Sequence, residues 1–184
     1  MARLKARLIY SNSLTAVNDV RYGCGFVAPD PVLLIILAKK QILVVSTMEQ
    51  GRAKRECYSS VEVLTPEELL LPPKKRWDIV EQIQAVAARV GIKTVEVGFD
   101  FPAGIYTKLM EKGWKVQLSP RSNYPTRRTK NQQEIEYIRN SQRAAVAGMK
   151  EAVARIASAD IGSRGALRDS QGVLTSERVR EAVQ

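Results

Sequence analysis

Short apolar runs alternate with segments in which apolar residues recur at helical spacing along the first 120 residues of the chain. Apolar runs of four to eight residues predict strands, whereas apolar positions that recur every three or four residues predict helices. The clearest stripe predicts a helix over 77–90, and Gly91 follows it as a C-cap. Its apolar positions are Ile79, Val80, Ile83, Val86, Ala87 and Val90.

The other blocks of this region give the remaining elements. Two apolar runs flank Lys39 and Lys40 and predict a β-hairpin whose strands are buried on both faces. Ser13 is an expected N-cap of a helix that Gly23 and Gly25 end. The expected strands are 7–11, 32–37, 41–46, 60–64, 94–98 and 114–118, and the further expected helices are 14–22, 48–56 and 103–112.

A helix-start signal also occurs at Thr65, because Pro66 and two glutamates follow it. Pro72 and Pro73 then interrupt the chain. Taken together, these elements predict an α/β fold with a mixed β-sheet of about six strands flanked by helices.

A long amphipathic helix is predicted over 131–158. Asn131 is a good N-cap, and Glu134 stands three residues later, as a capping box requires. We interpret Asp160 and the two residues after it as the turn that ends this helix, and we expect one more short helix beyond it. The apolar face comprises Ile135, Ile138, Ala145, Met149, Ala152 and Ile156.

The pattern divides the chain into an α/β domain over 1–120, a linker over 121–130 and a helical part over 131–184. The linker contains Pro, Ser, Asn and several basic residues, which favours an exposed, extended connection.

The net charge of +10 raises the question of nucleic-acid binding. Lys and Arg outnumber Asp and Glu by 9 to 4 over 1–60, balance them at 8 to 8 over 61–120, and outnumber them by 12 to 7 over 121–184. The excess is spread along the chain, and few aromatics accompany it, so no nucleic-acid partner is expected. No apolar run is long enough to span a membrane, and no signal peptide is recognised, so we expect a cytoplasmic protein.

Few residues suited to catalysis are present. The chain has no His, which excludes Ser-His-Asp and Cys-His arrangements within it, and no phosphate-binding glycine motif occurs. Cys24 and Cys57 belong to no C-x-x-C pair and are expected to be reduced thiols. We therefore assign no catalytic residue and no metal ligand in this chain.

Three short motifs occur in order along the chain. The first runs from Asp19 to Asp30 as D-x-x-Y-x-x-G-F-x-x-P-D. The second is E-x-x-R-A from Glu49, after the hairpin. The third is R-x-x-K-N-x-x-E-I-x-x-I-R from Arg127 to Arg139, where the long helix begins. Their order and spacing resemble the N-terminal domain and domain junction of creatinase, prolidase (Xaa-Pro dipeptidase) and Xaa-Pro aminopeptidase (aminopeptidase P).

This resemblance implies a mixed α/β N-terminal domain followed by the start of a pita-bread catalytic domain. Members of that family are hydrolases that hold two divalent metal ions, such as Mn, Co or Zn, with two Asp, one His and two Glu. These ligands would follow the long helix, so we expect 131–184 to hold the first helices of a catalytic domain truncated before its metal site.

The resemblance also suggests residues near the mouth of an active site. Tyr22 and Phe26 are the candidates for controlling substrate access, and the alternative is that both rings pack in the domain core. Glu49 and Arg52 stand one helical turn apart and are expected to form a structural ion pair.

We expect a non-catalytic N-terminal domain of an Xaa-Pro metallopeptidase-like protein. By resemblance it would support a homodimer and limit access of short proline-containing peptides to the metal site. One alternative is a non-enzymatic binding module of the same fold, either chaperone-like or partner-binding. A further alternative is a basic nucleic-acid-binding protein, and the diffuse charge makes this the weakest of the three readings.

Overall fold

The computed structural model describes residues 5–119 and 123–183. The chain forms two compact units, Met1–Arg127 and Arg128–Gln184.

The first unit is built on a six-stranded sheet in the order β4-β3-β2-β1-β5-β6. The strands are β1 (Lys5–Tyr10), β2 (Leu33–Ile36), β3 (Gln41–Val44), β4 (Val61–Leu64), β5 (Thr94–Val97) and β6 (Lys115–Leu118). β2 is antiparallel to both of its neighbours, β1 and β3, whereas the pairs β3–β4, β1–β5 and β5–β6 are parallel. All strands except β2 therefore end at the same edge of the sheet.

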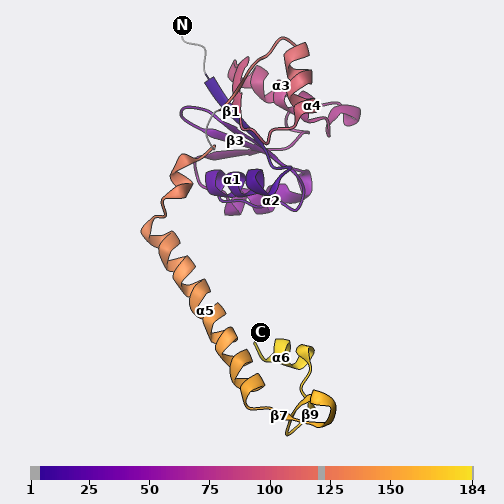
Figure 1. Ribbon diagram of the computed structural model, residues 1–184. Helices are drawn as coiled ribbons and strands as arrows, with labels where there is room; N and C mark the ends of the chain where they lie inside the picture. Colours follow the sequence, from indigo (N-terminus) through magenta and orange to yellow (C-terminus); the bar gives the residue numbers. More distant parts are fainter. Residues whose placement is uncertain (1–4, 120–122, 184) are drawn as a thin grey trace. The chain divides into compact units, whose positions relative to one another are not determined.

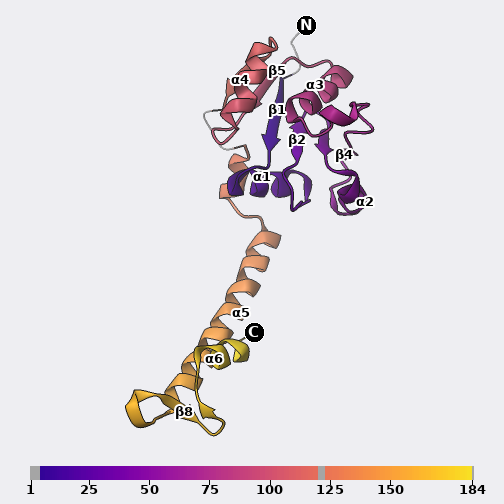
Figure 2. The same ribbon diagram turned by 90° about the vertical axis from the view of Figure 1, so that its right-hand side faces the viewer.

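Helices cover both faces of this sheet (Figure 1). Helices α1 (Leu14–Cys24) and α2 (Thr47–Glu56) lie on one face, and α3 (Ile79–Val90) and α4 (Ala103–Glu111) lie on the other. Figure 2 shows β5 and α4 on one side of β1, and β2 and β4 on the other side. The mixed six-stranded α/β fold expected from the sequence is confirmed.

Alternation along the central strands explains why two cores form. In β2 and β3, Leu34 and Leu43 are completely buried beneath α1 and α2, while Leu33 and Ile35 are completely buried beneath α3 and α4. Successive side chains of a strand point to opposite faces, so a strand that is apolar throughout needs cover on both. The helical stripe of α3 supplies that cover on one face with Ile83, which is fully buried.

The second unit begins with the expected long helix, α5 (Gln132–Ala157). Asn131 and Glu134 form the complete capping box: the Asn131 side chain accepts from the Glu134 backbone, and the Glu134 side chain accepts from the Asn131 backbone. The short helix α6 (Ser176–Ala182) lies beside α5, where Gly148 faces Val183. Apolar positions of α5 such as Ile138 and Met149 are 45% and 66% exposed within the described part of the chain.

The turn interpretation of Asp160 was wrong. Asp160 and Ile161 form β7 (Asp160–Ile161), which pairs with β8 (Leu167–Asp169), and β8 pairs with β9 (Gly172–Val173). The short 3-10 turn η3 (Ser163–Gly165) joins the first two strands. These strands have only two or three residues each, which is too short for a period of two to be recognised.

The helix expected to start at Thr65 does not form. The capping hydrogen bonds are present, since Glu68 Oε2 accepts from the Thr65 backbone at 2.9 Å and Thr65 Oγ1 accepts from the Glu68 backbone at 3.3 Å. The chain then turns: Leu70 has a φ of 58°, and the prolines lead into the 3-10 turn η1 (Pro73–Lys75). A proline inside a helix lacks the backbone donor that the helix needs, so the cap has no helix to follow it.

Two boundaries differ from the sequence expectation. Helix α1 continues through Gly23 to Cys24, and only Gly25, with a φ of 84°, ends it. In the expected linker over 121–130, residues 121 and 122 lie outside the described residues, and Asn123 is buried against the first unit rather than exposed. The 3-10 turn η2 (Pro125–Arg128) follows it, so this segment is not an extended connection.

Replacing Ile83 by Ala tests the core beneath α3. We expect the mutation to lower the free energy of unfolding by about 2–5 kcal/mol, because it removes buried methylene groups and leaves a cavity. Urea unfolding is followed by tryptophan fluorescence, since both tryptophans, Trp77 and Trp114, lie in the first unit. Leu14→Ala is the control: Leu14 is 80% exposed, so its loss is expected to change stability by no more than about 0.5 kcal/mol. Equal effects of the two substitutions would contradict this description of the core.

Candidate functional site

The residues predicted to control access lie at the end of α1. Gly25 takes the left-handed conformation that ends the helix, and the chain then turns inward. Phe26 is completely buried among the residues that α1 and α2 cover, whereas Tyr22 is half-buried. The two rings therefore have different surroundings: Phe26 is part of the core, and Tyr22 lies at its margin.

The predicted pair Glu49 and Arg52 joins the same region from α2. Arg52 Nε donates to Glu49 Oε2 at 3.0 Å, and a second, shorter bond joins Nη2 to the same oxygen. Arg52 Nη2 also donates to the Val27 carbonyl at 2.8 Å, and the guanidinium lies 4.6 Å from the centre of the Phe26 ring. Hydrogen bonding to Glu49 raises the pKa of Arg52 above its ordinary value. Arg52 thus fixes the turn after α1 by an ion pair, a backbone hydrogen bond and a cation–π contact.

A buried acid on α1 forms a site that sequence reasoning did not predict. Asp19 is 1% exposed, and its Oδ2 accepts from Asn123 Nδ2 at 2.7 Å. Its other oxygen forms an ion pair with Arg127. Arg7 on β1 donates to the backbone carbonyl of Asn123. We call this group of four residues the α1 junction, because it holds the segment 123–127 against α1 and β1.

Tyr124 extends the α1 junction to Tyr22. The two rings are 5.3 Å apart between centroids and inclined by 57°. A Cβ atom on Gly23 would lie 2.0 Å from the Tyr124 hydroxyl oxygen, so position 23 has room for no side chain while Tyr124 is in place. Burial raises the pKa of Tyr124 above its ordinary value. The notch at Gly23 is thus the reason for a glycine inside α1, where a helix otherwise disfavours it.

Asp19 and Arg127 each begin one of the three short motifs, but neither motif indicates that the two side chains pair. Asn123 and Arg127 follow Asp19 by more than 100 residues. A further local signal is Gly23, a glycine that does not end its helix. Such a glycine indicates a close approach by another segment, but it does not identify that segment as Tyr124.

The two cysteines meet beside the turn after α1. The Tyr58 backbone donates to the Cys24 carbonyl at 2.9 Å, which brings Cys57 close to Cys24, and both thiols are free. Desolvation raises the pKa of Cys24, and desolvation together with the proximity of Cys24 raises the pKa of Cys57 to about 12. Both thiols are therefore protonated at neutral pH and poorly nucleophilic.

Within residues 5–119 and 123–183, no group of three or more His, Cys, Asp and Glu side chains is arranged to hold a metal ion. Asp160 lies in the small sheet of the second unit. No helix in the described part of the chain is long and apolar enough to cross a bilayer.

The sequence and the fold of the chain resemble those of known proteins. The family model described as "Creatinase/Prolidase N-terminal domain" matches residues 2–128. A search of curated proteins found no match. Among solved structures, several peptidases share the fold of the chain.

Three of these structures illustrate the similarity. The X-Pro aminopeptidase from Thermotoga maritima MSB8 has a TM-score of 0.70 at 16% identity, over 98% of this chain and 45% of that protein. The prolidase from Pyrococcus horikoshii OT3 has a TM-score of 0.64 at 19% identity, over 98% and 44%. The prolidase from Pyrococcus furiosus has a TM-score of 0.61 at 15% identity, over 97% and 44%. The chain spans less than half the length of each.

Replacing Asp19 by Ala tests the α1 junction. We expect trypsin to cleave after Arg127 and Arg128 about tenfold faster, because the segment loses the acceptor that two of its side chains share. The rate is measured by mass spectrometry of timed digests under native conditions. Glu111→Ala removes an exposed carboxylate from α4 and serves as the control. If both variants are cleaved there at the wild-type rate, Asp19 does not hold this segment.

The raised pKa of Cys57 predicts slow alkylation. A pKa of about 12 means that the reactive thiolate forms only at high pH, so at pH 8 iodoacetamide should modify native Cys57 at least about a hundredfold more slowly than in the urea-unfolded chain. The modified peptide is quantified by mass spectrometry, and Cys57→Ser reports the separate rate of Cys24. Equal native and unfolded rates would contradict the desolvation of this half-buried thiol.

Proposed function

Because the chain belongs to the creatinase/prolidase N-terminal domain family, we propose that it is the non-catalytic N-terminal part of an Xaa-Pro metallopeptidase-like protein. In this role it supports formation of a homodimer and limits the access of short proline-containing peptides to a metal site located elsewhere in the protein. The observation that carries the proposal is the match of the family model over 127 of 184 residues, counted from residue 2 to residue 128.

The solved structures support the same assignment. Three proteins named as an X-Pro aminopeptidase or as prolidases have the fold of this chain over nearly all of its length. More than half of each of those proteins lies outside the match. We assign the hydrolytic chemistry of the family to the region that corresponds to this unmatched part.

The residues of this chain do not fit the two-metal set that the family resemblance implies. That set needs a His, and the sequence contains none. In the part of the chain that the structure describes, the acids form no cluster suited to a metal. No catalytic step is therefore assigned to these residues. We propose that the divalent ions, such as Mn, Co or Zn, are bound in the region that corresponds to the unmatched part of the family proteins.

Tyr22 is the residue we propose for the access role. It lies half-buried at the end of α1, and its hydroxyl is 3.4 Å from Thr126 Oγ1. Phe26 is completely buried, so we propose that it acts indirectly, by holding the turn that presents Tyr22. Glu49 and Arg52 support that turn and keep their structural role.

The homodimer is proposed on the apolar face of α5. Its four larger side chains, Ile135, Ile138, Met149 and Ile156, are 38% to 66% exposed in the described part of the chain. Burying one such side chain contributes roughly 1.5–3 kcal/mol, so a face of this size favours association with another surface. A cytoplasmic location and the absence of a nucleic-acid partner remain proposals from the composition and the spread of charge.

The same exposed face favours one second candidate, a non-enzymatic binding module that covers α5 with a partner protein. The two candidates differ in what the complete gene product does. We propose to express the full reading frame of the gene beside residues 1–184 and to assay both for hydrolysis of Xaa-Pro dipeptides with Mn²⁺, Co²⁺ or Zn²⁺. Hydrolysis by the full product alone supports the peptidase proposal. Turnover by residues 1–184 contradicts it, and a lack of activity in both products favours the binding module.

Charged substitutions on α5 test the dimer. Wild type is expected to be dimeric at micromolar concentration by light scattering, and Ile138→Glu with Met149→Glu is expected to yield a monomer, because each Glu would be desolvated between the apolar faces. Gln133→Glu with Asn140→Glu adds the same charge at exposed polar positions outside the apolar stripe of α5 and is the control. A monomeric wild type at high micromolar concentration would refute association through this face.

A further inference from the structure

Two pairs of neighbouring parallel strands in the first unit send their following helices to opposite faces of the sheet. After β1 the chain forms α1 on one face, and after the adjacent β5 it forms α4 on the other. After β3 it forms α2 on the first face, and after the adjacent β4 it forms α3 on the second. In α/β sheets, ligands bind in the crevice that such diverging connections open at the carboxyl ends of the strands.

The chain itself occupies the first of these crevices. Ser13, after β1, donates to Asp100, after β5, at 2.6 Å. The amide of Asn123 lies against Gly98, where a Cβ atom would be 3.1 Å from its nitrogen. Arg7 and Asp19 hold Asn123 in this position. Direct contacts within the chain thus close the crevice between β1 and β5.

The second crevice contains a cavity of about 370 Å³. Val44 and Val45 form its floor at the end of β3, and Met48 and Glu49 border it from the first turn of α2. Pro66 and Trp77 border it from the connection between β4 and α3. Cavities of this volume with mostly apolar walls and a few polar groups are typical of small-molecule sites.

The charge at the cavity has one sign. Asp30 and Glu49 are the charged residues that line it, and none of the described lining residues is Lys or Arg, although the protein as a whole carries a net charge of +10. Arg52 pairs with Glu49 from outside the lining, whereas Asp30 is exposed and has no ion pair within the described residues. The cavity therefore offers a carboxylate that is free to face a cation.

Trp77 adds an aromatic surface to this acidic cavity. It is 74% exposed, an unusual state for so large an apolar side chain, and Met48 beside the cavity is 94% exposed. An indole face attracts cations more strongly than the other aromatic side chains do. A ligand with an apolar body and an ammonium group could place the body over Val44 and Val45 and the charge near Asp30 and Trp77.

We propose that the crevice between β3 and β4 is a binding site for a small organic cation, a primary ammonium carried on an apolar or aromatic group. The residues that line this site include neither Tyr22 nor any residue of the α1 junction. It requires no metal and no covalent step.

Three molecules of nearly equal shape test the charge preference. Tryptamine carries an ammonium, tryptophol replaces it with a hydroxyl, and indole-3-propionate replaces it with a carboxylate. Their binding to the 184-residue chain is measured by isothermal titration and ligand-observed NMR up to about 20 mM, because small ligands in open sites bind weakly. Tryptamine is expected to bind about five- to tenfold more tightly than tryptophol. Indole-3-propionate is expected to bind most weakly of the three.

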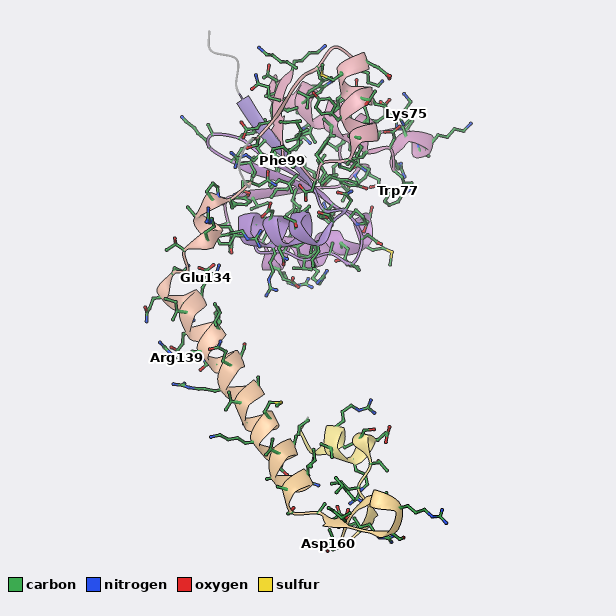
Figure 3. The ribbon with its side chains drawn as sticks, viewed as in Figure 1. Lys75, Trp77, Phe99, Glu134, Arg139 and Asp160 are labelled. Atoms are coloured by element: carbon green, nitrogen blue, oxygen red, sulfur yellow. The ribbon has the colours of Figure 1, made fainter. Side chains whose placement is uncertain are left out.

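Paired variants locate the binding. Trp77→Ala is expected to weaken tryptamine binding by about fivefold or more, whereas Phe99→Ala is expected to leave it unchanged. Phe99 is the matched control because it is also an aromatic residue with 74% exposure, but it is not among the residues that line the cavity. Figure 3 labels Phe99 and Trp77 at separate places on the first unit. Asp30→Asn is expected to weaken tryptamine binding by about threefold and to leave tryptophol binding unaffected. All three positions are exposed, so circular dichroism melts should match wild type.

Three results would each overturn the proposal. The first is the absence of saturable tryptamine binding to wild type. The second is tryptophol or indole-3-propionate binding as tightly as tryptamine. The third is equal weakening by Trp77→Ala and Phe99→Ala.

Discussion

The buried carboxylate of Asp19 determines where the first unit ends. An acid whose side chain is 2% exposed is stable in its charged form only if it is paired and hydrogen-bonded. Its partners come from Asn123 and Arg127, so the chain must return to α1 after β6 before it can continue to α5. Tyr124 then fits the notch that Gly23 leaves open. One desolvated charge thus fixes the path of a segment that composition alone describes as a linker.

The antiparallel direction of β2 determines how the other strands pair. Because the chain reverses once between β1 and β2 and again in the β2–β3 hairpin, β1 and β3 run in the same direction although they are not neighbours. Each then pairs in parallel with a strand whose helix lies on the opposite face. The unit therefore has two crevices at the same edge. Asn123 closes one of them, and the cavity beside Trp77 remains open in the other.

Local signals in the sequence were sufficient for most of the fold. The stripe of α3, the capping box of Asn131 and the apolar strands on both sides of Lys39 correctly predict their elements, because each depends on spacing within one segment. The failure at Thr65 has a clear cause: a cap satisfies the first turn of a helix, but the prolines at 72 and 73 deny it a continuation. The junction of Asp19 with Asn123 could not be predicted, since it joins residues that are 104 positions apart. A single sequence contains no signal for such a pairing.

The pair Glu49 and Arg52 links the turn after α1 to the open crevice. Glu49 binds Arg52 while bordering the cavity, and Arg52 reaches Val27 and Phe26 on the other side. The guanidinium is suited to this position because its flat fork can bond a carboxylate and a carbonyl while stacking on a ring, which a lysine ammonium cannot do. Asp30 and Glu49 both line the cavity, so a cation bound there would be close to the carboxylate that holds Arg52. Glu49 therefore takes part both in the lining of the cavity and in the support of the turn. Through this side chain, the apolar crevice and the end of α1 have a direct physical connection.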